Sequence, residues 1–208
     1  MMVKLNKNLM ENLKAVDQNI SLNIYRSATR HIGSRVPSYH RWLRALEYSC
    51  HGIFWLVATI ISLYLVSNNK AAALLLTGLI LDIIAVAVIK AMARRRRPGY
   101  ARQDDHLTIG PDKHSFPSGH CSRAIYLAMF FGNLSPLLSL AVWLWSLSVC
   151  ASRVLLGRHH LFDAVFGAFL GYLIYSLQYT IFTPINTLFV WLISALFNVV
   201  FSDTNDFD

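Results

Sequence analysis

Long apolar runs are the feature that most restricts what this chain can fold into. From residue 50 onward they follow one another with polar breaks between them, and only 14% of the 208 residues are charged. A soluble domain carries about 25% charged residues, so this chain lacks the polar side chains needed to cover a globule in water. The same apolar content excludes disorder, since there is ample material to bury. The sequence therefore predicts a protein that lies in a membrane.

The apolar runs have the length of membrane-crossing helices, which need about 20 predominantly apolar residues. They predict an all-α integral membrane bundle of about six transmembrane helices, at residues 50–66, 71–89, 118–134, 137–151, 161–182 and 185–201. Thr183 and Pro184 separate the last two runs, as expected where a proline ends a helix. We expect an N-terminal region over 1–49, a transmembrane domain over 50–201 and an acidic tail over 202–208.

The N-terminal region has the pattern of an amphipathic helix. Apolar residues recur there at spacings of three and four, which is one face of a helix: Leu5, Leu9, Leu13, Val16 and Ile20. Lysines accompany them, so the helix could lie flat on an anionic membrane surface. A helix packed on the rest of the protein fits the same pattern, and the sequence leaves both possibilities open. The region has neither the apolar core nor the cleavage site of a signal peptide.

The formal charge of +8 is unevenly distributed. Eight of the 19 basic residues lie in 1–49, and eight more lie between Lys90 and Arg123. With six spans, both termini and the polar segments 90–117 and 152–160 lie on one side of the membrane, which the positive-inside rule predicts to be cytosolic. The basic runs flank membrane spans and form no basic domain, which argues against nucleic-acid binding.

The polar segments on that side, with the residues next to them, contain three motifs with specific residue spacings. The first is KAMARRRRPGY, the second SFPSGHCSR and the third ASRVLLGRHHLFD. Their candidate site residues are Lys90 and Arg97, then Ser118, Gly119 and His120, then Arg153, His159 and Asp163. In this order and spacing the segments resemble the three-part signature of the type-2 phosphatidic-acid phosphatase superfamily, which also includes vanadium haloperoxidases. Their local context is most similar to the polyisoprenoid diphosphate phosphatases.

The residue types themselves suit phosphoryl transfer, which depends on positioning and on stabilising negative charge. Lys90, Arg97 and Arg153 would bring three cations from separate helix ends, and guanidinium groups bind phosphate in a bidentate manner. Ser118 and Gly119 would begin a helix, where free backbone N–H groups bind anions. These five residues are the expected phosphate-binding set.

The resemblance implies the remaining roles and a phosphatidic-acid phosphatase type 2/haloperoxidase-like core. His159 would be the nucleophile that forms a phosphohistidine, and His120 would protonate the departing oxygen and then activate water. Asp163, four residues after His159, can hold one imidazole nitrogen so that the other attacks. The sequence shows no carboxylate cluster for a metal, so we expect a reaction without metal or other cofactor.

The resemblance also implies a substrate class and a location. The expected substrates are presqualene, farnesyl and geranylgeranyl diphosphates and lipid phosphates such as phosphatidic acid, with the bilayer as the other partner. The endoplasmic reticulum and nuclear envelope are the expected membranes, and the oligomeric state stays open. A catalytically silent scaffold of the same fold and a vanadate-dependent haloperoxidase are the alternatives.

Charged residues near the motifs receive interpretations from their context. Arg94, Arg95 and Arg96 are interpreted as a patch for anionic lipid head groups. Asp82 lies inside an expected span, and we expect it to pair with a structural partner. Arg123 lies one helical turn past the second motif, and whether it faces the phosphate stays open.

The other histidines and the cysteines have simpler interpretations. Histidines outside the motifs are expected to be solvated at the membrane boundary: His31, His40, His51, His106 and His114. His160 would face about 100° away from its neighbour on a helix, so it is left out of the site. The cysteines are odd in number and lack metal-ligand spacing, which predicts small buried apolar residues rather than disulfides: Cys50, Cys121 and Cys150.

Overall fold

The computed structural model describes residues 2–66, 70–100 and 114–180, together with 187, 188, 191, 192 and 195. This part of the chain is nearly all helical. Its elements are α1 (Met2–Ala28), a π-helix (Thr29–Gly33), α2 (Tyr39–Ser49), α3 (Gly52–Leu65), α4 (Lys70–Ala93), α5 (Gly119–Phe131), α6 (Pro136–Leu155) and α7 (Leu161–Thr180). The all-α fold expected from the apolar runs is confirmed.

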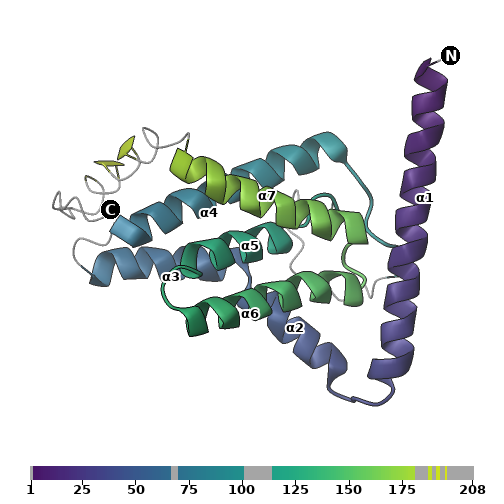
Figure 1. The fold of residues 1–208 in the computed structure, drawn as a ribbon, viewed down its shortest axis with the longest axis horizontal. Helices are drawn as coiled ribbons and strands as arrows, with labels where there is room; N and C mark the ends of the chain where they lie inside the picture. The colour runs from purple at the N-terminus through teal and green to yellow at the C-terminus, as the bar shows by residue number, and fades with distance from the viewer. Residues whose placement is uncertain are drawn as a thin grey trace.

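Helix α5 lies at the centre of the bundle formed by α3 to α7 (Figure 1). It packs against α4, α6 and α7, and every residue from 121 to 128 is buried. The largest core cluster joins α4, α5 and α7 through apolar side chains that include Leu79, Leu127 and Leu170. The bundle thus encloses the helix that begins with the second motif.

The helices differ in whether they could cross a membrane. Three of those described are long and apolar enough: 70–93, 136–155 and 161–178. Helices α2 and α3, which meet at a bend of 44°, would make a fourth span if they count as one. Helix α5 has 13 residues and is only about 20 Å long at 1.5 Å per residue, short of the hydrocarbon thickness of about 30 Å. Its neighbours enclose it, which explains its apolar composition without a full crossing.

The expected count of six spans is therefore not confirmed. The expected span at 185–201 lies almost entirely outside the described residues. The three long helices nevertheless establish the membrane-spanning character of the bundle.

Two glycines bring α7 against the backbone of α5. A Cβ atom at Gly167 would overlap the carbonyl oxygen of Ser118, and one at Gly171 would overlap that of Ser122. Such close approach requires glycine, since any side chain would separate the helices. The packing fixes the start of α7, next to the third motif, beside the start of α5, which belongs to the second.

The cysteines are free, as the sequence predicts. Cys50 and Cys121 are buried, and Cys150 is partly buried. They contribute to apolar clusters of the bundle.

Helix α1 lies across the end of the bundle where α4 and α6 end and α7 begins (Figure 1). It contacts α6 and α7, and the face it turns to them is partly polar, with Asp17 and Ser21 fully buried. The apolar face points away, leaving Leu9 57% exposed and Val16 50% exposed. The helix therefore packs on the protein through its polar face. Its apolar face stays exposed and can meet a membrane surface.

Candidate active site

The second motif forms the N-terminus of α5. Ser118 precedes the helix, and its hydroxyl accepts a hydrogen bond from the backbone N–H of Cys121 at 3.4 Å. The backbone N–H of Ser118 donates to the carbonyl of Asp163 at 3.0 Å, which ties the second motif to the third. Gly119 lies against Val86 of α4, where a Cβ would be 3.2 Å from that side chain. The start of α5 is thereby held between α4 and α7.

His159 lies in the loop between α6 and α7 and is only 1% exposed. Its Nδ1 is 2.6 Å from the carbonyl oxygen of Ser115. A carbonyl only accepts hydrogen bonds, so Nδ1 carries the proton and Nε2 holds the free lone pair. Burial, followed by the positive charges of Arg153, Arg97 and Lys90, lowers the pKa of His159 well below its ordinary value. The imidazole is therefore neutral near pH 7, with Nε2 as its nucleophilic atom.

Asp163 makes its hydrogen bonds to other groups. Its Oδ2 is 4.0 Å from Nδ1 of His159, which is longer than a hydrogen bond. The same oxygen accepts from the backbone N–H of His160 at 2.9 Å and is 3.2 Å from the ring Nδ1 of that residue. His160, left out of the site on sequence grounds, is thus a buried partner of Asp163. The group in contact with Nδ1 of His159 is the Ser115 carbonyl, and the orienting role of Asp163 stays a prediction.

Arg95 connects this site to α1. Its two terminal nitrogens bind Asp163 at 2.8 Å and Asp17 at 2.6 Å. Asp17 also accepts from the backbone N–H of Phe162 at 3.0 Å, so α1 caps the first turn of α7. The interpretation of the arginine run as one lipid-binding patch is therefore wrong for Arg95, while Arg94 and Arg96 are exposed.

Asp17, His160 and Asp163 together could supply ligands for a metal, with their ligand atoms within 4.8 Å of one another. No sequence pattern predicts this cluster, because Asp17 is far from the other two residues along the chain. The guanidinium of Arg95 already binds both carboxylates and supplies the positive charge there. These ion pairs explain the cluster without a metal.

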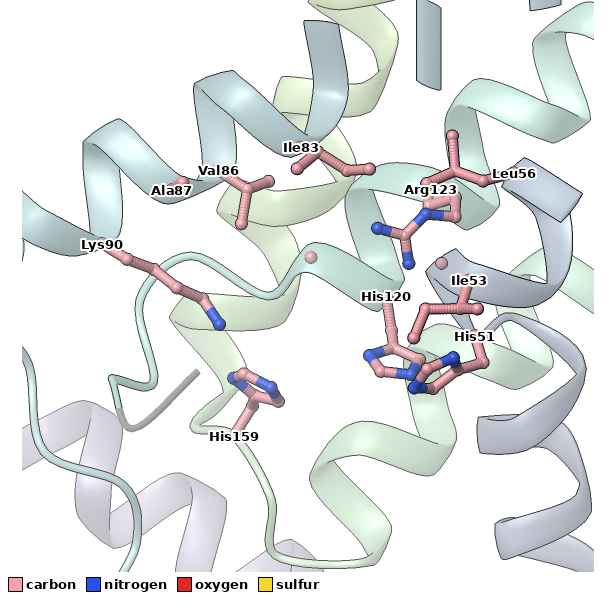
Figure 2. Close-up of a pocket in the computed structure, with 12 residues that line it drawn as sticks. His51, Ile53, Leu56, Ile83, Val86, Ala87, Lys90, His120, Arg123 and His159 are labelled. Atoms are coloured by element: carbon pink, nitrogen blue, oxygen red, sulfur yellow. The ribbon is translucent and has the colours of Figure 1, made fainter. Parts of the chain in front are cut away.

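The three predicted phosphate-binding cations have different surroundings. Lys90, 4% exposed, extends from α4 toward His159 (Figure 2). Arg97 is partly buried. Arg153, at the end of α6, is 2% exposed and forms an ion pair with Glu47 of α2. Glu47 lies outside the motifs, but it is the only carboxylate between residues 18 and 81. Such an isolated acidic residue in a basic region is the sequence signal that predicts a partner for one of the arginines.

A pocket of about 310 Å³ opens between α3, α4 and α5 (Figure 2). Among the predicted site residues, Lys90, Gly119, His120 and His159 line it. The others lie around this core without lining it: Arg97, Ser118, Arg153 and Asp163. The remaining wall is mostly apolar and consists of Gly52, Ile53, Leu56, Ile83, Val86 and Ala87. The pocket thus has a positively charged residue, Lys90, at one end and an apolar wall that could contact a hydrocarbon chain.

Two polar residues outside the predicted set line the same pocket. His51, expected to be solvated, lies beside His120 with ring centroids 6.4 Å apart. Arg123 donates to the carbonyl of Cys50 at 3.2 Å and lies 3.4 Å from the carboxylate of Asp82. Asp82 therefore has the structural partner that its position in a span predicts. His51 gave no spacing signal, because its role depends on how α3 begins beside α5.

The chain is similar to known proteins of one family in sequence and in fold. Residues 71–187 match the PAP2 superfamily. The probable lipid phosphate phosphatase beta of Arabidopsis thaliana is 31% identical, with the match covering 46% of this chain and 58% of that protein. The match thus spans less than two thirds of that relative.

Two crystal structures share the fold. The first transmembrane PAP2 type phosphatidylglycerolphosphate phosphatase from Bacillus subtilis has a TM-score of 0.63 at 23% identity, covering 80% of this chain and 84% of that one. LpxE of Aquifex aeolicus has a TM-score of 0.60 at 19% identity, covering 76% and 93%. Because the family match takes in more than half of the chain and includes all three motifs, this protein belongs to the PAP2 superfamily.

Proposed function

We propose that this protein is a membrane lipid phosphatase that releases phosphate from polyisoprenoid diphosphates and from lipid phosphates such as phosphatidic acid. One observation carries the proposal: His159 shares a pocket with His120 and Lys90, and the wall of that pocket is largely apolar. The phosphate would lie against the cationic end, and the hydrocarbon chain would lie along α3 and α4.

The chemistry would proceed in two steps. Nε2 of His159 attacks phosphorus, the bond from phosphorus to the leaving oxygen breaks, and His120 gives that oxygen its proton. Water then attacks the phosphohistidine, its proton passes to His120, the N–P bond breaks and inorganic phosphate leaves. Lys90, with Arg97 and Arg153 close by, would stabilise the charge on the phosphoryl oxygens.

The site would face the cytosol, from a membrane of the endoplasmic reticulum or nuclear envelope. The excess of basic residues in 1–49 supports this orientation. Asn19 lies in an acceptor sequence for glycosylation and is exposed on α1, so it should stay unmodified in cells. A glycan on Asn19 would overturn the orientation.

The activity is tested by a substrate panel on purified protein in detergent, with EDTA present. The panel contains farnesyl diphosphate, geranylgeranyl diphosphate and phosphatidic acid, and phosphate release is measured. We expect turnover in EDTA and its loss in His159→Ala, whereas the exposed His31→Ala serves as the matched control. Labelled substrate should leave an acid-labile phosphoprotein that His159→Ala lacks.

Three results would contradict the proposal. Equal phosphate release by His159→Ala and wild type would exclude the mechanism. No release by correctly folded wild type would favour the silent scaffold. Bromide peroxidation on addition of vanadate, without phosphate release, would favour the haloperoxidase.

A further inference from the structure

The pocket contains a second polar cluster besides the predicted phosphate-binding residues. We propose that Arg123, His51 and the N-terminus of α3 form a subsite for the leaving phosphate of a diphosphate substrate, which makes the enzyme prefer lipid diphosphates over monophosphates with the same chain. This inference rests on the proposed function and adds the residues that would determine its specificity.

The first argument is the position of Arg123. It is only 8% exposed, yet it lines the pocket, and its guanidinium group points into it (Figure 2). Its two terminal nitrogens contact the Cys50 carbonyl and the Asp82 carboxylate, while its buried Nε has no hydrogen-bond partner among the described residues. A buried guanidinium at the pocket wall favours a negatively charged group in the pocket, since hydrogen bonds from arginine to anions are the stronger ones.

The second argument is the start of α3. The first N–H groups of a helix have no partner within the helix, and they attract anions. This helix begins at Gly52 without a side-chain cap, and both Gly52 and Ile53 line the pocket. A Cβ at Gly52 would be 3.0 Å from the guanidinium of Arg123, so the glycine lets the arginine lie against the helix start. Two positive groups thus lie side by side.

The third argument is the order of groups along the pocket. Lys90 and His159 lie at one end, His120 and His51 lie together, and Arg123 reaches in from the opposite side (Figure 2). In a diphosphate the attacked β-phosphorus is followed by the bridging oxygen, the α-phosphate and then the hydrocarbon chain. With β-phosphorus at His159 and the bridging oxygen at His120, the α-phosphate falls next to His51 and Arg123.

The subsite would act when the phosphorus–oxygen bond breaks. The bridging oxygen then leaves with the α-phosphate and takes its proton from His120, so negative charge develops where Arg123 lies. A lipid monophosphate loses an alcohol oxygen instead and places no phosphate at this position. Asp82, which also accepts from Ser122, holds the guanidinium in place from the side of α4.

The test compares two substrates with the same chain, farnesyl diphosphate and farnesyl monophosphate. We measure the ratio of their kcat/KM values in wild type, in Arg123→Gln and in the control Arg35→Gln, an exposed arginine that lines no described pocket. The ratio should fall at least tenfold in Arg123→Gln and stay unchanged in the control. A ratio that does not change in a folded Arg123→Gln protein would overturn the subsite, since a merely structural role lowers both values together.

Arg123→Gln leaves the buried Asp82 without a cation, so folding is checked by size-exclusion chromatography in detergent. If that variant fails to fold, the double variant Arg123→Gln with Asp82→Asn removes both charges, and His51→Gln leaves the ion pair intact. We expect a lower ratio in each folded variant, and an unchanged ratio in both would overturn the proposal.

Failure of the subsite and failure of the proposed function give different results. If wild type hydrolyses farnesyl diphosphate but the ratio does not respond, the function stands and the subsite is wrong. If wild type hydrolyses only phosphatidic acid, the polyisoprenoid specificity is wrong, and diacylglycerol diphosphate against phosphatidic acid becomes the substrate pair. If no lipid is hydrolysed, inorganic diphosphate should still raise the unfolding temperature more than phosphate does, and Arg123→Gln should remove that difference.

Discussion

Replacing Gly171 by alanine tests the close packing of α7 on α5. The new Cβ would overlap the carbonyl oxygen of Ser122 and would be 2.8 Å from its carbonyl carbon and 3.1 Å from its Cα. Carbon atoms in favourable contact are about 3.5–4.0 Å apart, so the helices must separate by about 1 Å. The obstacle is helix backbone, which cannot rotate away as a side chain would.

The magnitude follows from two opposing effects. Overpacking costs about 1–3 kcal/mol, and a backbone clash places this variant near the upper limit. Alanine is favoured over glycine in a helix by about 1 kcal/mol, which offsets part of the loss. We expect a net loss of about 2 kcal/mol in the free energy of unfolding. For a chain of this size that corresponds to a fall of about 4–8 °C in Tm.

Thermal unfolding in detergent, followed by tryptophan fluorescence, measures this change. Gly33→Ala is the matched control, because its Cβ would meet Tyr39 at an ordinary distance of 3.5 Å. The control should unfold at or slightly above the wild-type temperature. A Tm of Gly171→Ala equal to or above that of wild type would refute the reasoning, since it would mean that the two backbones are not in contact.

Three further predictions concern charges. Because the pKa of His159 is lowered, the acidic limb of kcat/KM, corrected for substrate titration, should lie below about pH 6.5. Stability should also decrease as pH drops through that value, where the unfolded state takes up the proton first. An acidic limb above pH 6.5 would contradict this. Glu47→Gln leaves Arg153 buried without its carboxylate, so the free energy of unfolding should fall by about 3 kcal/mol in the same thermal assay, and an unchanged Tm would exclude the pairing. Asp17→Asn weakens the ion pair that joins α1 to Arg95, and a hydrogen bond to a charged group contributes about 1.5–3 kcal/mol. Limited trypsin digestion should therefore cleave α1 about tenfold faster in this variant. Equal cleavage rates would show that this ion pair does not hold α1 on the bundle.

The sequence was informative where chemistry or hydropathy is local. Apolar runs located α4 and α6, although the helices extend to Ala93 and Leu155, beyond the expected ends at residues 89 and 151. Hydropathy marks where side chains change from apolar to polar, while backbone hydrogen bonds continue for another turn. The motif residues Lys90, Gly119 and His120 were predicted together and line one pocket, because each lies at or near a helix end facing the same space.

Contacts between residues far apart in the chain could not be predicted from the sequence. Arg95 and Asp17 are 78 positions apart, and no spacing rule connects them. The Ser115 carbonyl in contact with His159 is a backbone group, so the residue types along the chain carry no signal for this contact. The sequence does not decide whether Arg123 faces the phosphate, because helix spacing gives the direction of a side chain only within its own helix. The contacts of Arg123 come from α3 and α4.

The ion pairs of Asp17 and Glu47 bear on how the protein can be shortened. The family match begins at residue 71, so a fragment cut at that boundary would keep every motif residue. It would lose both carboxylates, so Arg95 would keep only Asp163 as its partner and the buried Arg153 would lose Glu47. The first 49 residues therefore supply carboxylates that pair with two arginines near the candidate site, and expression studies should retain them.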